Sequence, residues 1–170
     1  MKTLTIFGIL LSMSLCSCNT ESPKKNDTNA VKREKSEVPE TPKEDVRAIT
    51  QAPGVIFYDI TLDEALKKAK EEGKYVLIDC YTKTCGPCRR MEKEIFPHEK
   101  LGDFVNERFV PIMRDMEEGE GVKIAEEYKV QIYPTMLVLL PNATKEGEII
   151  GAEFNIDSLI EMLKDIIHEK

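Results

Sequence analysis

The sequence contains no tryptophan and few histidines: His98 and His168 are its 2 imidazole side chains. A metal site built on several histidines is therefore not expected. Basic residues are also in the minority, since 24 Lys and Arg stand against 31 Asp and Glu, for a formal net charge of −7. Nucleic-acid binding relies on clustered positive charge, so we expect no nucleic-acid partner.

Long apolar runs are absent after the first residues. Residues 4–15 are apolar and follow Lys2, but a stretch of about 12 residues is too short to span a bilayer comfortably. The stretch is typical of a secretory signal, and residues 15–18 resemble the lipobox of bacterial lipoproteins. Cys18 fits as the acylated residue because it comes after a serine, whereas Cys16 would require cleavage after a bulky leucine.

We therefore expect residues 1–17 to be a lipoprotein-type signal peptide and Cys18 to carry the lipid anchor. This places the protein outside the cytoplasm, on the periplasmic side, attached to the membrane. An ordinary cleaved signal is the alternative. Residues 18–53 have almost no large apolar side chains and are expected to be a disordered tether. Residues 54–170 are long enough to bury one core, and we expect a monomer.

Strand and helix patterns alternate within residues 54–170. Apolar, β-branched and aromatic runs predict strands at 55–60, 75–81, 109–113, 136–140 and 148–151. Helical spacing predicts a helix from Thr61 to Gly73, one from Cys88 that breaks at Pro97 and resumes, and two more at 122–128 and 156–167. This order predicts an α/β fold, a central mixed β-sheet with helices on both faces.

Two cysteines, Cys85 and Cys88, stand where a strand ends and a helix begins. The unpaired N–H groups and the dipole of a helix N-terminus stabilise a thiolate, so the pKa of Cys85 is expected to be low. Cationic side chains flank this thiol: Lys83, Arg89 and Arg90. Cys88 lies one turn further along, close enough to attack a disulfide formed on Cys85. A short dithiol of this kind is typical of redox chemistry, whereas structural disulfides usually close longer loops.

The segment Cys85-Gly86-Pro87-Cys88, six positions after Asp79, resembles the active site of the thioredoxin family. Residues 132–135 agree with it, because Tyr133-Pro134-Thr135 resembles the family's cis-proline loop. Gly151 matches the family's late glycine. The resemblance covers residues 54–168 and implies the thioredoxin fold, with a cis bond before Pro134.

The resemblance also implies roles for these residues. Asp79, directly or through water, would take the proton from Cys88, although a structural hydrogen-bonding role is the alternative. The loop of Tyr133, Pro134 and Thr135 would present backbone to the substrate, with Tyr133 facing the sulfur site or simply packing. No cofactor is implied. The partners would be disulfide-containing proteins and a membrane electron donor.

The sequence departs from the family pattern at several positions. The lysine that often accompanies the aspartate has no counterpart, and Met113 or Arg114 occupies its region. Cys80 replaces an aromatic residue and is expected to be an inert core thiol, with a regulatory third thiol as the alternative. Thr84 replaces the tryptophan that commonly precedes the first cysteine, which removes a flat apolar surface beside the active site.

We therefore expect a thiol:disulfide oxidoreductase that reduces, or isomerises, disulfides of extracytoplasmic proteins. A copper or zinc chaperone is one alternative, and it would require Cys80 as a third ligand near the pair. A non-catalytic interaction module on the same fold is another.

Overall fold

The computed structural model of this chain describes residues 53–169. The expected signal peptide, Cys18 and the expected tether up to residue 52 lie outside the described residues. The described part contains a mixed sheet in the order β2-β1-β3-β4. Its strands are β1 Tyr75–Tyr81, β2 Phe109–Asp115, β3 Thr135–Leu139 and β4 Lys145–Ile150. β1 pairs with β2 in parallel, and β3 is antiparallel to both β1 and β4.

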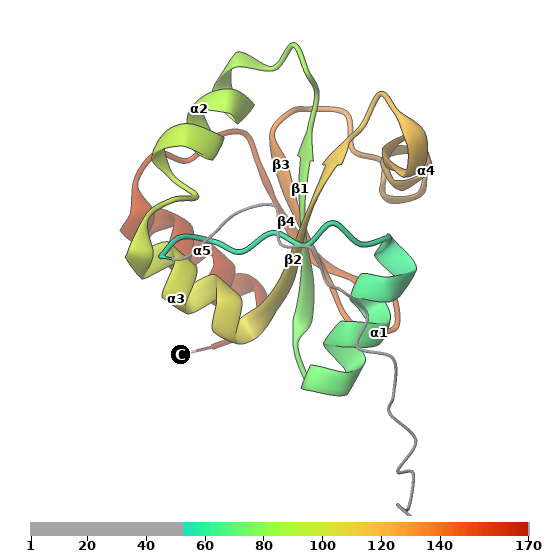
Figure 1. Cartoon of the computed structure of the whole chain (residues 1–170), viewed down its shortest axis with the longest axis horizontal. Helices are drawn as coiled ribbons and strands as arrows, with labels where there is room; N and C mark the ends of the chain where they lie inside the picture. Colours follow the sequence, from blue (N-terminus) through green and yellow to red (C-terminus); the bar gives the residue numbers. More distant parts are fainter. Residues whose placement is uncertain (1–52, 170) are drawn as a thin grey trace, which may run out of the picture. The chain divides into compact units, whose positions relative to one another are not determined.

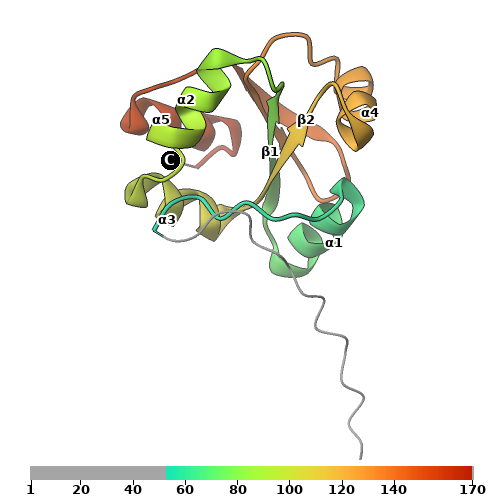
Figure 2. The ribbon, with the colours of Figure 1, turned by 45° about the horizontal axis from the view of Figure 1, so that its top comes forward.

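Helices cover both faces of the sheet (Figure 1). One face carries α1 Leu62–Glu72 and α4 Gly119–Tyr128; the other carries α2 Gly86–Glu94, α3 Glu99–Arg108 and α5 Ile156–Ile166. The same two groups of helices are separated by the sheet in the second view (Figure 2). The predicted α/β fold is confirmed. Within residues 53–169, no helix combines the length and the apolar character needed to cross a membrane.

The alternation of side chains along β1 decides what each helical layer contacts. Val76, Ile78 and Cys80 pack in the cluster beneath α1 and α4. Leu77 packs in the cluster beneath α2, α3 and α5. Because neighbouring residues of a strand point to opposite faces, Asp79 lies on the α2 side of the sheet and Cys80 on the far side.

The prediction of a strand at 55–60 is wrong. This segment makes a single bridge, in which Tyr58 N donates to Pro111 O at 2.9 Å. The preceding N–H groups bond elsewhere, Val55 N to Phe96 O at 2.7 Å and Ile56 N to Asn106 Oδ1 at 2.9 Å, so the pairing does not extend into a ladder. Pro111 lies on the edge strand β2 and has no N–H of its own to donate. The segment still contributes to the core, because Val55 and Phe57 are buried against the α2 side.

The predicted helix boundaries are largely confirmed. Thr61 caps α1 through a capping box with Glu64, and Gly73 ends the helix at φ +67°. The helical segments around Pro97 are two separate helices, as the proline predicted. The active-site helix α2 begins at Gly86, two residues before the predicted start, so that Cys85 is its N-cap.

Candidate redox-active site

Cys85 and Cys88 form a disulfide across the first turn of α2, with their Cα atoms 5.3 Å apart. Cys85 is the N-cap residue, and its Sγ accepts a hydrogen bond from Cys88 N at 3.1 Å. Cys85 is partly exposed, whereas Cys88 is 5% exposed. The geometry therefore places the accessible sulfur at the helix N-terminus, where a thiolate is stabilised, and the second sulfur behind it.

The cations that flank Cys85 in sequence are less available than expected. Lys83 forms an ion pair with Glu118 and lies 3.9 Å from Asp115. Arg90 pairs with Glu94 at 2.8 Å and stacks on the exposed Phe154 ring. These pairs neutralise two of the three charges, so the thiolate of Cys85 would rely mainly on the helix N-terminus and on Arg89.

Asp79 is the most strongly perturbed acid of the site. Its side chain is buried, and Oδ1 has no hydrogen-bond partner within residues 53–169. Burial, with a smaller contribution from the negative charge of Glu92, raises its pKa from 3.8 to about 7. A carboxyl with this pKa can accept and release a proton near neutral pH.

Asp79 and Cys88 line the same cavity, of about 450 Å³, between α2 and the ends of β1 and β2. The other lining residues are Asp59, Tyr81, Thr82, Lys83, Arg89, Glu92, Met113 and Arg114. Met113 is the register partner of Asp79 on β2, so a methionine occupies the position expected for the family's lysine. The cavity therefore brings the predicted proton acceptor and the second cysteine to one space, with no lysine amine at that position.

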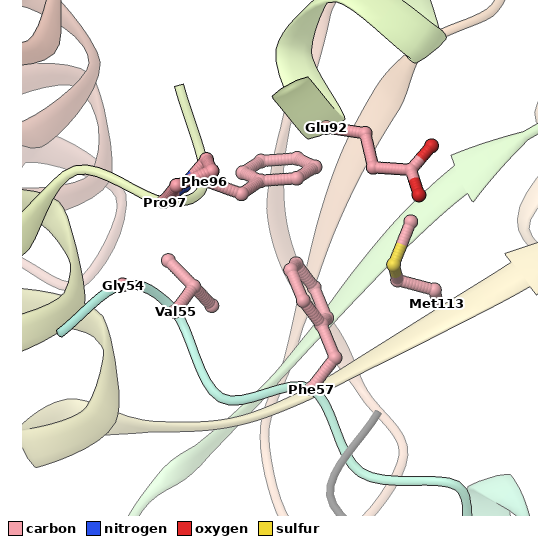
Figure 3. A pocket seen from close by; sticks show the side chains of 7 residues that line it. All are labelled: Gly54, Val55, Phe57, Glu92, Phe96, Pro97 and Met113. Atoms are coloured by element: carbon pink, nitrogen blue, oxygen red, sulfur yellow. The ribbon is translucent and has the colours of Figure 1, made fainter. Parts of the chain in front are cut away.

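Glu92 is a residue that the sequence analysis missed. It lies one helical turn after Cys88 on α2 and lines the same cavity of about 450 Å³ as Asp79 and Cys88. It also lines an adjoining cavity of about 240 Å³, where Figure 3 shows its carboxylate near Met113 and apart from the facing rings of Phe57 and Phe96. The four-residue spacing from Cys88 was the available signal, because such residues share one face of a helix.

Replacing Glu92 with glutamine is expected to lower the pKa of Asp79. The substitution keeps the side-chain shape but removes the negative charge that disfavours the ionised form of Asp79. Carbon NMR of the Asp79 carboxyl should show a midpoint near 7 in the unchanged protein and a lower midpoint in the variant. Glu94→Gln is the control, because Glu94 is on the same helix but pairs with Arg90; an equal shift in both variants would contradict the prediction.

The loop before β3 has the geometry that the resemblance implied. The Tyr133–Pro134 peptide bond is cis, and Pro134 O accepts a hydrogen bond from Gly151 N at 2.8 Å. Gly151 has φ +89°, a conformation that favours glycine. Thr135 Oγ1 donates to Ile132 O at 2.8 Å, which closes the turn. Tyr133 packs against the apolar cluster beneath α1 and α4, which is the packing role that the sequence left open.

Cys80 does not join the cysteine pair. It is fully buried on the opposite face of the sheet, and burial raises the pKa of its thiol. Within residues 53–169, no group of three or more His, Cys, Asp or Glu residues could hold a metal ion. The third ligand that a metal chaperone would need is thus directed away from Cys85 and Cys88.

Comparisons with known proteins agree with this geometry. Residues 62–167 match the family model of the thioredoxin-like domain. The solved structure of a candidate disulphide isomerase from Bacteroides thetaiotaomicron is similar, with a TM-score of 0.62, 36% identity, and coverage of 71% of this chain and 99% of that one.

Two curated relatives are similar over a comparable part of this chain. Thioredoxin-2 of Pyricularia oryzae is 34% identical over 101 residues, which are 59% of this chain and 55% of the relative. The thiol:disulfide interchange protein DsbD of Pseudomonas fluorescens is 28% identical over 102 residues, 59% of this chain and 18% of the relative. The chain thus spans about half of one relative and less than a fifth of the other. On the family model and the cysteine geometry together, the chain belongs to the thioredoxin family.

Proposed function

We propose that this protein is a thiol:disulfide oxidoreductase that acts on disulfides of extracytoplasmic proteins. The observation that carries the proposal is that the two cysteines differ in exposure and in position. Cys85 is partly exposed at the N-terminus of α2, and Cys88 is buried beside Asp79 in one cavity. This arrangement suits an attacking thiolate and a resolving thiol with its own proton acceptor.

The reaction can be derived from these positions. The Cys85 thiolate attacks one sulfur of the substrate disulfide, a mixed disulfide forms, and the other substrate sulfur leaves as a thiolate. Asp79 takes the proton of Cys88, whose thiolate attacks Cys85 Sγ. The Cys85–Cys88 bond forms, and the second substrate sulfur leaves as a thiolate. The substrate has gained two electrons, and its two thiolates take up the proton held by Asp79 and one proton from solvent. The loop of Tyr133, Pro134 and Thr135 would hold the substrate backbone during exchange.

We propose reduction as the main direction, with isomerisation as the second activity. The Gly-Pro pair between the cysteines resembles that of reducing thioredoxins, whose potential is near −270 mV, against about −120 mV for a strong periplasmic oxidant. The similarity to a candidate disulphide isomerase supports the second activity. The similarity to part of an interchange protein supports a membrane dithiol protein as electron donor. The proposal includes an anchor at Cys18 on the periplasmic side.

The Cys88→Ala variant tests the proposal. Without the resolving thiol, mixed disulfides on Cys85 cannot be released, so the variant purified from cells should carry covalently attached proteins that a reductant removes. The measurement is non-reducing electrophoresis with mass spectrometry of the released proteins. The double variant Cys85→Ser with Cys88→Ala is the control and should carry none. A Cys88→Ala protein free of partners would contradict the proposal.

A further inference from the structure

The two cysteines of the pair differ in whether they line the cavity beside Asp79. Cys88 lines the cavity of about 450 Å³ beside Asp79, whereas Cys85 is not among its lining residues. Small-molecule sites are typically about 300–1,000 Å³ in volume, so the cavity has a size that suits a small molecule. The Asp79 side chain, 2% exposed and with Oδ1 unpartnered within residues 53–169, forms part of the wall. A buried acceptor of this kind favours an occupant that brings a hydrogen-bond donor.

The lining carries acidic and basic side chains in equal number: the acids Asp59, Asp79 and Glu92, and the bases Lys83, Arg89 and Arg114. Two of the bases are already paired, Lys83 with Glu118 and Arg114 with Glu120. Arg89 donates to the Lys83 carbonyl at 2.7 Å, and no ion pair of Arg89 or Asp59 is present in the described part of the chain. The cavity thus offers a guanidinium for a carboxylate and a carboxylate for an ammonium group.

On the basis of the proposed dithiol function, we propose that this cavity binds low-molecular-weight amino-acid thiols and their disulfides, and gives them direct access to Cys88. Free cysteine, or a small peptide that contains it, has the required chemistry: a carboxylate, an ammonium group and a sulfur. The site would let small thiols reduce the pair without a protein donor.

The exchange balances in atoms and electrons. The bound thiol gives its proton to Asp79 and attacks Cys88 Sγ; the Cys85–Cys88 bond breaks, and Cys85 leaves as a thiolate. Cys85 is the better leaving group, because the helix N-terminus stabilises its anion and a thiol of lower pKa leaves faster. A second small thiol then attacks the sulfur bound to Cys88, its proton going to Cys85 or solvent. The small disulfide leaves, and Cys88 takes the proton held by Asp79.

The full-length Cys85→Ser variant tests access to Cys88. Exposure to cystine should convert Cys88 to a mixed disulfide with cysteine, located by mass spectrometry of the tryptic peptides, while the disulfides of insulin should leave Cys88 unmodified. The same variant in urea should react with both, which shows that the thiol is intact. If Cys88 of the folded variant does not react with cystine, or reacts equally with insulin, the inference is overturned.

Selectivity for charged thiols is tested on the intact pair. The rate at which cysteine reduces the disulfide, divided by the rate for uncharged 2-mercaptoethanol, should fall about tenfold in Arg89→Ala, because a charge-assisted hydrogen bond is lost. A change in the reactivity of Cys85 as leaving group would alter both rates by the same factor, so it cancels in their ratio. Arg90→Ala is the matched control, since Arg90 is adjacent in sequence but outside the cavity lining, and its ratio should not change. Equal ratios in both variants overturn the inference.

A separate experiment tests the proposed dithiol function independently of the cavity. In Cys88→Ser, the remaining Cys85 should still form mixed disulfides with insulin. If it does so while Cys88 fails to react with cystine in Cys85→Ser, the cavity inference alone is wrong. If Cys85 is also unreactive, the proposed function is wrong as well.

Discussion

Replacing Asp79 with asparagine is expected to stabilise the oxidised protein at pH 8 by on the order of 2–4 kcal/mol. Burial raises the pKa of this carboxyl from 3.8 to about 7, so at pH 8 the folded protein must hold an unfavourable buried charge. Asparagine is never charged. Its amide is still a buried polar group. The expected gain in the free energy of unfolding is therefore smaller than the free energy that corresponds to the full pKa shift.

The sign of the pH dependence is set by the same shift. Between about pH 4 and pH 7, Asp79 is protonated in the folded state and ionised in the unfolded state, so the folded state binds more protons. The free energy of unfolding therefore falls as pH rises through this window, and the difference between the variant and the unchanged protein should grow over it. Urea unfolding at several pH values measures this. Asp59→Asn, an exposed acid of the same cavity, is the control, and the same gain in that variant would refute the assignment.

Replacing Cys85 with serine is expected to reduce insulin reduction by at least about 1,000-fold, because a hydroxyl cannot act as the thiolate nucleophile. The assay measures precipitation of the insulin B chain with dithiothreitol as electron source. Activity of the wild-type protein in this assay also tests the proposed direction of electron transfer, from the dithiol to the substrate disulfide.

Cys80→Ala provides the matched cysteine control. Cys80 is buried on the α1 and α4 side of the sheet, so its loss should leave the rate within about twofold while lowering stability slightly through lost packing. If Cys85→Ser retained activity, or if Cys80→Ala lost it, the assignment of the nucleophile would be wrong.

The parts of the fold that local rules govern were predictable. The strand at 75–81, the capping box at Thr61 and the break at Pro97 each depend on a few neighbouring residues. The cysteine pair at the start of a helix was predictable for the same reason. The order of all the predicted strands and helices, together with the family resemblance, predicted the mixed sheet and its two helical layers.

The errors concern contacts between distant residues. The segment at 55–60 does not form a strand because its N–H groups bond to Phe96, Asn106 and Pro111, which lie far along the chain. Nothing within the segment indicates these partners. The neutralisation of Lys83 depends on Glu118, which belongs to a separate loop. The importance of Glu92 depends on which face of α2 turns toward Asp79. Such facts are decided by packing, which periodicity does not specify.

The proline on β2 also bears on how copies of the protein behave at high concentration. An exposed sheet margin is a template for growth into fibrils, because its backbone groups can accept another strand. At this margin, Pro111 offers no donor, and its carbonyl is already taken by Tyr58. A strand from a neighbouring copy would meet an interrupted row of partners, so this side of the domain resists edge-to-edge aggregation.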